Sequence, residues 1–280
     1  TMAQDIDAIA ITSSTDSHAA LIVESAAAGL HIFCEKPIDL ALPAIIDARE
    51  AVAQAGVKLQ LGFNRRFDPD FQQVREHITA GRVGKIHLVR LTSRDPCPPS
   101  VEYIKTSGGL FLDMMIHDFD MARFLVGDEV STIFAVGDAL VDPAIGRLGD
   151  LDTAVVTMVF RNGAICTIDN SRRAVYGYDQ RAEVFGDRGC AMTSPEHLNP
   201  GHFWDHNAEK RDLRDDFFIR RYMTAYRAQL DAFVSCIETD QSPTVDGLDG
   251  QRALELGLAA KESWATGRMV NVVYDDIKAP

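Results

Sequence analysis

The chain has 280 residues, of which 46% are hydrophobic, and its 41 acidic and 28 basic residues give a net charge of −13. This length accommodates one large or two ordinary domains, and the acidic balance argues against a nucleic-acid or anionic-membrane partner. No apolar run reaches the roughly 18 residues that span a bilayer.

Five scattered cysteines form no C-x-x-C pair, and the first residues lack the basic region of a signal peptide. The histidines at 197, 202 and 206 match no standard ligand spacing, so no metal is expected. The sequence therefore predicts a protein of the reducing cytoplasm that handles small molecules.

The first 65 residues alternate short apolar strands with helices that end at a glycine. The expected elements are strands over 6–12, 31–34 and 57–61, and helices over 18–28 and 41–55. This βαβαβ order is typical of a doubly wound parallel sheet, which binds ligands at the carboxyl ends of its strands.

Polar clusters follow each of these strands. Ser13, Ser14 and Thr15 either cap the next helix or offer hydroxyl and N–H groups to a cofactor, and the pattern favours neither reading. Lys36 precedes Pro37, which biases it toward an extended conformation just past a buried strand. A solvated surface lysine remains the alternative.

The pattern changes near residue 65, where we expect a domain boundary. A helix over 70–80 and a rigid loop at 94–99 precede further elements, and 187–216 follows no clear pattern. The expected later elements are strands over 85–92, 131–140, 153–160, 164–171, 180–185 and 270–274, and helices over 217–238 and 247–266. Asn162-Gly163 indicates a hairpin. A large, mostly antiparallel sheet is predicted, with the helix pair packing back on the first domain.

The stretch Gly108–Phe124 predicts one largely buried helix. Asp113 and His117 are four residues apart, so one face would carry both. A carboxylate there would orient the imidazole and favour its cationic form. An isolated Asp–His pair is more often structural, so only other features can make it catalytic.

These motifs together resemble the glucose-fructose oxidoreductase / inositol dehydrogenase family. The resemblance rests on the runs CEKPIDL, GFNRRFDPDF, TSRDP, PSVEYIKTSGG, IHDFDMARFLVG, VDPAIG, DTAVVTMVF, IDNSR and AVYGYDQR. It implies an α/β fold, with a partial Rossmann domain (1–65) and an α/β domain with a large open sheet (66–280). It also implies a homodimer or homotetramer paired through that sheet.

The resemblance further implies NAD-dependent oxidation of a ring hydroxyl of myo-inositol to a ketone. His117 would be the base, Asp113 its partner, and Lys36 would stabilise the developing oxyanion, although Lys36 and His117 could exchange roles. The cofactor would contact Ser13, Ser14, Thr15, His18, Glu35, Lys36, Pro37, Asn64 and Arg65. The substrate would contact Lys36, Arg65, Asp95, Asp113, His117 and Tyr176.

The chain departs from the family at its start. No G-x-G-x-x-G is present, and about 60 residues, or two βα units, of the family's Rossmann domain are missing. The residue that separates NAD from NADP is among them, so NADP is not excluded. An incomplete copy is expected over a genuine short protein. The alternatives are a dehydrogenase for scyllo-inositol or glucose, or a non-enzymatic binding or regulatory relative.

Overall fold

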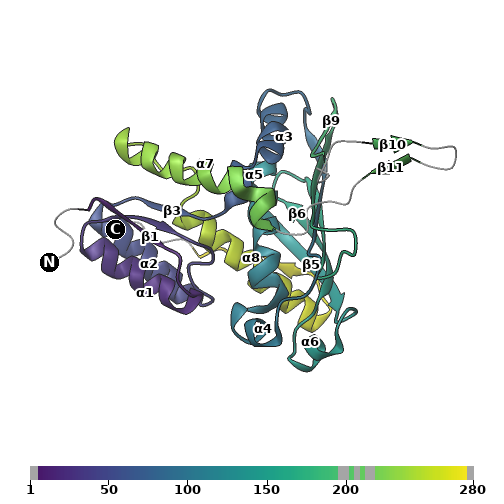
Figure 1. Cartoon of the computed structure of the whole chain (residues 1–280), viewed down its shortest axis with the longest axis horizontal. Coiled ribbons are helices and arrows are strands. Elements are labelled where there is room, and N and C mark those ends of the chain that lie inside the picture. Colours follow the sequence, from purple (N-terminus) through teal and green to yellow (C-terminus); the bar gives the residue numbers. More distant parts are fainter. Residues whose placement is uncertain (1–5, 195–201, 205–208, 212–217, 276–280) are drawn as a thin grey trace.

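The computed structural model describes residues 6–194, 202–204, 209–211 and 218–275, arranged as in Figure 1. In chain order the elements are β1 (Ala8–Ile11), α1 (Thr15–Ala27), β2 (His31–Cys34), α2 (Leu42–Ala55), β3 (Leu59–Leu61), η2 (Asn64–Phe67), α3 (Pro69–Thr79), β4 (Ile86–Arg94), α4 (Val101–Ser107), η3 (Leu110–Met114), α5 (Ile116–Val126), β5 (Val130–Asp138), α6 (Pro143–Arg147), β6 (Thr153–Phe160), β7 (Ile165–Ser171), β8 (Asp179–Gly186), β9 (Cys190–Met192), β10 (His202–Trp204), β11 (Glu209–Arg211), α7 (Phe218–Glu238), α8 (Gly247–Thr266) and β12 (Val270–Asn271). The predicted α/β class is confirmed.

The smaller sheet is parallel, in the order β1-β2-β3, as the βαβαβ pattern predicts. Helices α1 and α2 lie together on one side of it, and α7 crosses the other side (Figure 1). The crossing is fixed by aromatic packing, since the ring centroids of Phe33 in β2 and Phe233 in α7 are 6.0 Å apart. The carboxyl ends of all three strands point toward the larger sheet.

The larger sheet has the order β12-β5-β6-β7-β4-β8-β9. Only β4 and β7 pair in parallel, and the remaining neighbours are antiparallel, which confirms a mostly antiparallel sheet. Helices α5 and α8 cover one face, while the other face is open (Figure 1). Strand alternation separates the two, because Val89, Leu91 and Ser93 are buried, whereas Leu88 and Arg90 are exposed.

The stretch Gly108–Phe124 is not the single α-helix that the sequence predicts. A π-helical turn, η3, comes first, and α5 starts only at Ile116. The turn depends on packing that spacing does not reveal. Gly109 adopts φ +81°, and a Cβ there would lie 2.6 Å from Asp150 Oδ1, the atom that accepts from the Leu110 amide. Only glycine tolerates this approach, and π turns often occur at functional sites.

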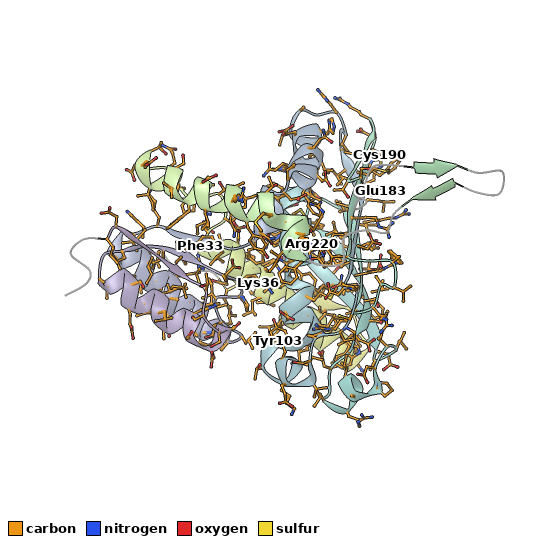
Figure 2. All side chains as sticks on the ribbon, viewed as in Figure 1. Phe33, Lys36, Tyr103, Glu183, Cys190 and Arg220 are labelled. Carbon is orange, nitrogen blue, oxygen red and sulfur yellow. The ribbon has the colours of Figure 1, made fainter. Side chains whose placement is uncertain are left out.

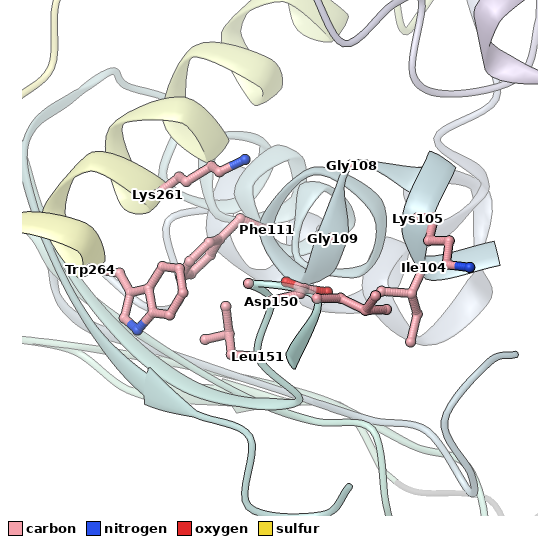
Figure 3. Close-up of a pocket in the computed structure, with 11 residues that line it drawn as sticks. Ile104, Lys105, Gly108, Gly109, Phe111, Asp150, Leu151, Lys261 and Trp264 are labelled. Carbon is pink, nitrogen blue, oxygen red and sulfur yellow. The ribbon is translucent and has the colours of Figure 1, made fainter. Parts of the chain in front are cut away.

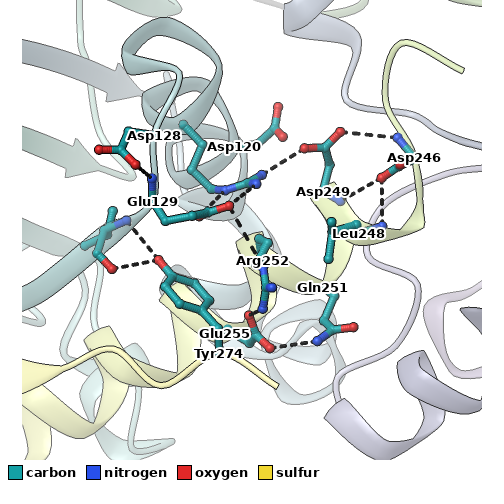
Figure 4. A network of polar contacts seen from close by, with 12 residues as sticks. Asp120, Asp128, Glu129, Asp246, Leu248, Asp249, Gln251, Arg252, Glu255 and Tyr274 are labelled. Atoms are coloured by element: carbon teal, nitrogen blue, oxygen red, sulfur yellow. Dashed lines mark hydrogen bonds and ion pairs between the residues drawn. The ribbon is translucent and has the colours of Figure 1, made fainter. Parts of the chain in front are cut away.

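Charged side chains join α5 to α8 behind the large sheet (Figure 4). Arg123 donates to Glu129 and to Asp249, and Arg252 of α8 pairs with Glu255. These side chains are largely buried, and Arg123 has two carboxylate partners, so the charges compensate one another within the network. The network therefore anchors the helix that carries His117 to the body of the protein.

No described helix is both long and apolar enough to cross a membrane. The final strand is shorter than predicted and covers only Val270–Asn271. Two short helices, α4 and α6, occupy stretches where the sequence analysis assigned no element.

Candidate active site

Lys36, just after β2 of the small sheet, and Asp113, in the η3 turn, lie in contact. Lys36 follows β2, and its Nζ donates to the main-chain oxygen of Asp113 at 2.8 Å and lies 3.3 Å from Asp113 Oδ1. The side chains are only 16% and 12% exposed. Figure 2 places Lys36 between the small sheet and the helices of the large one, with Tyr103 nearby. The surface-lysine alternative is therefore wrong.

The Asp113 carboxylate has two further partners that sequence reasoning missed. The Tyr103 hydroxyl donates to Oδ1 at 2.9 Å, and Nη2 of Arg172 lies 3.6 Å from Oδ2. Tyr103 lies on α4, whose start is capped by Ser100 accepting from the Tyr103 amide. A serine after two prolines could have indicated that helix. No local signal in the sequence places Arg172 beside residue 113.

His117 does not have the partner or the charge that its spacing suggests. Its ring packs edge-on against Phe63 with centroids 5.9 Å apart, and its Nδ1 is buried without a hydrogen-bond partner in the described structure. The pKa of His117 lies well below its ordinary value, mainly because the ring is buried and secondly because Lys36 and Arg65 are positively charged. The expected cationic imidazole is wrong, because the Asp113 carboxylate faces Lys36, Tyr103 and Arg172. A neutral ring can still accept a proton.

Arg65 is held in a buried cluster beneath this site. Its Nη1 donates to Asp118 at 2.7 Å and to Ser93 at 2.9 Å, and Asn170 donates to the other Asp118 oxygen at 3.0 Å. Asn64 beside it is also buried. Contact of Asn64 and Arg65 with a ligand stays a prediction, whereas their burial at the strand-end edge is observed.

Asp95 follows β4 and is tied by its main chain to the loop after β7. Its amide donates to Ser171 and its carbonyl accepts from Ala174. Burial raises the pKa of Asp95 to about 6, opposed by the charges of Arg172 and Arg65. The residue therefore lies within the electrostatic reach of the Asp113–Arg172 pair.

Tyr176, the remaining predicted substrate contact, has different partners. Its hydroxyl donates to Asp179 at 2.8 Å and accepts from Arg94 at 3.1 Å. Arg94 also pairs with Asp169, in a cluster on the open face of the sheet. The structure thus groups Tyr176 with open-face residues and not with Lys36 and Asp113.

The predicted cofactor residues cluster at the carboxyl ends of β1 and β2. His18 is buried and joins the two loops, with Nδ1 2.8 Å from the Pro37 carbonyl and Nε2 2.9 Å from the Ser13 carbonyl. Ser14 occupies the N-cap position of α1 but makes no capping bond, and Thr15 opens the helix. The cluster therefore does head the helix, but the Ser14 hydroxyl donates to the Asp16 side chain and does not cap an amide.

Glu35 completes this edge. A Cβ at Gly62 would lie 2.5 Å from Glu35 Oε2, so the glycine is needed for the carboxylate to sit there. Burial raises the pKa of Glu35, and Lys36 and His18 oppose that shift. Exposed hydroxyls at Ser13 and Ser14, with Lys36 and the unpartnered His117 Nδ1 beyond them, suit the polar nicotinamide end of a dinucleotide.

A separate hollow of about 280 Å³ lies on another side of the η3 turn (Figure 3). Gly108, Gly109, Trp264 and Lys261 contribute to its lining, but Lys36, Asp113 and His117 do not. It is therefore distinct from the candidate active site. No group of three or more His, Cys, Asp or Glu in the described residues could hold a metal ion. His197 and His206 lie outside those residues.

This arrangement, in which Lys36 at the edge of a parallel nucleotide-type sheet meets Asp113 of η3 and lies near His117 of α5, defines an oxidoreductase of the Rossmann type. Residues 1–63 match the model of the oxidoreductase family with an NAD-binding Rossmann fold, and residues 71–192 match the GFO/IDH/MocA C-terminal domain. NAD, the predicted cofactor, is what this family domain binds. The chain belongs to the GFO/IDH/MocA oxidoreductase family, as its motifs predicted.

Individual relatives span nearly the whole chain. Myo-inositol 2-dehydrogenase of Thermotoga maritima is 46% identical over 268 residues, which cover 96% of this chain and 80% of that protein. A crystal structure of a probable dehydrogenase from Thermotoga maritima matches with TM-score 0.95 and 45% identity, over 96% of this chain and 81% of that one. A scyllo-inositol dehydrogenase from Lactobacillus casei, solved with NAD(H) and scyllo-inositol, matches with TM-score 0.89 and 31% identity, over 97% and 82%.

Proposed function

We propose that the protein oxidises one ring hydroxyl of myo-inositol to a ketone with NAD as the hydride acceptor. The observation that carries this proposal is the Lys36–Asp113 contact beside a neutral, buried His117, at the carboxyl edge of the NAD-binding sheet. The 46% identity to a myo-inositol 2-dehydrogenase supports the choice of substrate.

In this proposal His117 accepts the hydroxyl proton, and the site holds the carbinol carbon where a bound nicotinamide would accept its hydride. NAD, when bound, supplies the hydride acceptor. Lys36 donates a hydrogen bond to the reacting oxygen and stabilises the negative charge that develops on it. Asp113 holds Lys36 in place through its main-chain oxygen and its carboxylate. The opposite assignment, with Lys36 as base, remains the alternative.

Kinetics of single variants test these roles. His117→Ala and Lys36→Ala should each lower kcat by about 10²-fold or more, the usual range for loss of an acid–base group, with the fold retained. NADH formation from myo-inositol measures the effect, and His77→Ala on α3 serves as a control with unchanged kcat. Near-normal turnover in both site variants would contradict the proposal.

The second candidate is a dehydrogenase for scyllo-inositol, favoured by the 31% identical structure that contains it. A panel of myo-inositol, scyllo-inositol and glucose, each with NAD and NADP, separates the candidates by kcat/KM. A non-enzymatic relative would turn over none of them and would not bind NAD in a calorimetric titration.

We also propose that the open face of the large sheet joins two copies of the chain in a homodimer or tetramer. Its exposed apolar side chains include Phe134, Val136, Val155 and Phe185, each more than a third exposed. Light scattering should give a multiple of the chain mass, and Val155→Glu should reduce it. Val23→Glu, on exposed α1, is the control that should leave it unchanged. We place the protein in the cytoplasm, which its five free thiols suit.

A further inference from the structure

Arg172 has no role in the mechanism above, yet its guanidinium is among the most enclosed polar groups of the site. It follows β7 directly, and its side chain is 2% exposed. Its amide donates to the Asp152 carbonyl at 2.8 Å, which holds the main chain in place. Asn170, two residues earlier, points to the same helix-covered face, where it bonds Asp118. Arg172 therefore reaches the site from the sheet side.

One edge of this guanidinium is unpartnered. Both Nε and Nη2 are buried and make no hydrogen bond in the described structure. The nearest carboxylate oxygen, Asp113 Oδ2, lies 3.6 Å from Nη2, which is too far for a hydrogen bond. Nε–H and one Nη2–H point in the same direction, so together they can bind two oxygens side by side.

Arg172, Lys36 and Tyr103 all lie at the same carboxylate, that of Asp113. Lys36 and Tyr103 both approach Oδ1 of Asp113, and Arg172 lies by Oδ2. Lys36 is the group that must reach the reacting oxygen. An oxygen-rich ring held against Lys36 would thus bring its neighbouring hydroxyls toward Arg172. Buried donors without acceptors are costly, and a polyol supplies acceptors on every carbon.

We propose that the Nε–Nη2 edge of Arg172 binds two adjacent hydroxyl oxygens of the cyclic polyol and so orients the ring against Lys36 and His117. This role rests on the proposed function, because it names a substrate contact of the same site. A counter-ion for Asp113 alone would need only charge, which a lysine also provides. The paired donors of the fork distinguish the two roles.

Two variants separate charge from geometry. Arg172→Lys keeps the positive charge without the fork, and Arg172→Gln removes the charge. Both variants should raise KM for myo-inositol about 10-fold or more, because the loss of one charge-assisted hydrogen bond weakens binding by about that factor. Calorimetric titration with myo-inositol, with and without NADH, should give the same loss of affinity without turnover. Arg173→Gln, an exposed neighbour on the same loop, is the matched control that should keep wild-type values.

Deoxy-inositols that each lack one hydroxyl supply the decisive comparison. The wild type should bind the analogues that lack either hydroxyl bound by Arg172 about 10-fold more weakly, and Arg172→Lys should bind them as it binds myo-inositol. Wild-type affinity and discrimination in Arg172→Lys would overturn the proposal, whatever its stability. Failure of the wild type to oxidise any inositol would instead overturn the proposed function, so the two failures are distinguishable.

Discussion

The two faces of the large sheet carry similar polar residues with opposite surroundings. On the covered face Arg65 pairs with Asp118, and the two side chains are 5% and 3% exposed. On the open face Arg94 pairs with Asp169 at the similar distance of 2.6 Å, but the exposures are 34% and 37%. Ser93 and Arg94 are adjacent in the chain and belong to different faces. Burial, and not contact distance, therefore decides which ion pair matters for stability.

The sharpest test of this contrast removes one carboxylate from each face. Asp118→Ala should destabilise the fold by about 3–5 kcal/mol, because Arg65 is left as a buried charge without a carboxylate. Asp169→Ala should cost about 0–1 kcal/mol, because water replaces the lost partner. Urea unfolding midpoints measure both. Equal losses in the two variants would remove the distinction between the faces.

Replacing Asp95 should have a smaller effect on the stability of the fold, and this effect should depend on pH. Burial raises the pKa of Asp95 from 3.8 to about 6 in the folded protein. Between these values the folded state binds more protons than the unfolded state, so its stability falls as pH rises. The free energy of unfolding of Asp95→Asn, relative to that of the wild type, should therefore rise by roughly 1–3 kcal/mol between about pH 4 and 6. Above about pH 6 this difference should stay constant. A difference that does not change with pH would mean that Asp95 titrates normally.

The smallest effect is expected from the open-face tyrosine. Tyr176→Phe removes the hydrogen bonds to Asp179 and from Arg94. Asp179 retains Arg181 at 3.0 Å and Arg94 retains Asp169, so the change should cost about 1 kcal/mol or less. KM for myo-inositol should stay within about 2-fold of the wild type, since the hydroxyl bonds Asp179 and Arg94. A 10-fold rise in KM would make Tyr176 a substrate contact after all.

The sequence predicted the elements that local patterns determine. Short apolar strands ending at polar clusters placed Lys36 and Glu35 at a ligand-binding edge, and alternation predicted the open sheet. Local patterns could not predict η3, because that turn depends on Gly109 packing against Asp150, whose carboxylate also accepts from the amide of Leu110, 40 residues before it. For the same reason the spacing of Asp113 and His117 suggested a pair that the structure does not contain.

Local patterns failed to identify two partners of Asp113 for the same reason. Tyr103 and Arg172 meet Asp113 only after the chain has folded, and the runs PSVEYIKTSGG and IDNSR that contain them do not reveal this contact. The assignment of Tyr176 to the substrate came from resemblance and stays a prediction. In the described structure its hydroxyl bonds Asp179 and Arg94.

The Lys36 amine joins the end of β2 to Asp113 of the η3 turn, 77 positions further along the chain. This contact therefore connects the small sheet to the turn that precedes α5. Because linkage is reciprocal, a ligand that binds more tightly when this contact is closed also stabilises the closed arrangement by the same free energy. Calorimetric titration of Lys36→Met with NADH and with myo-inositol would measure this coupling. The coupling is the factor by which one bound ligand changes the affinity for the other.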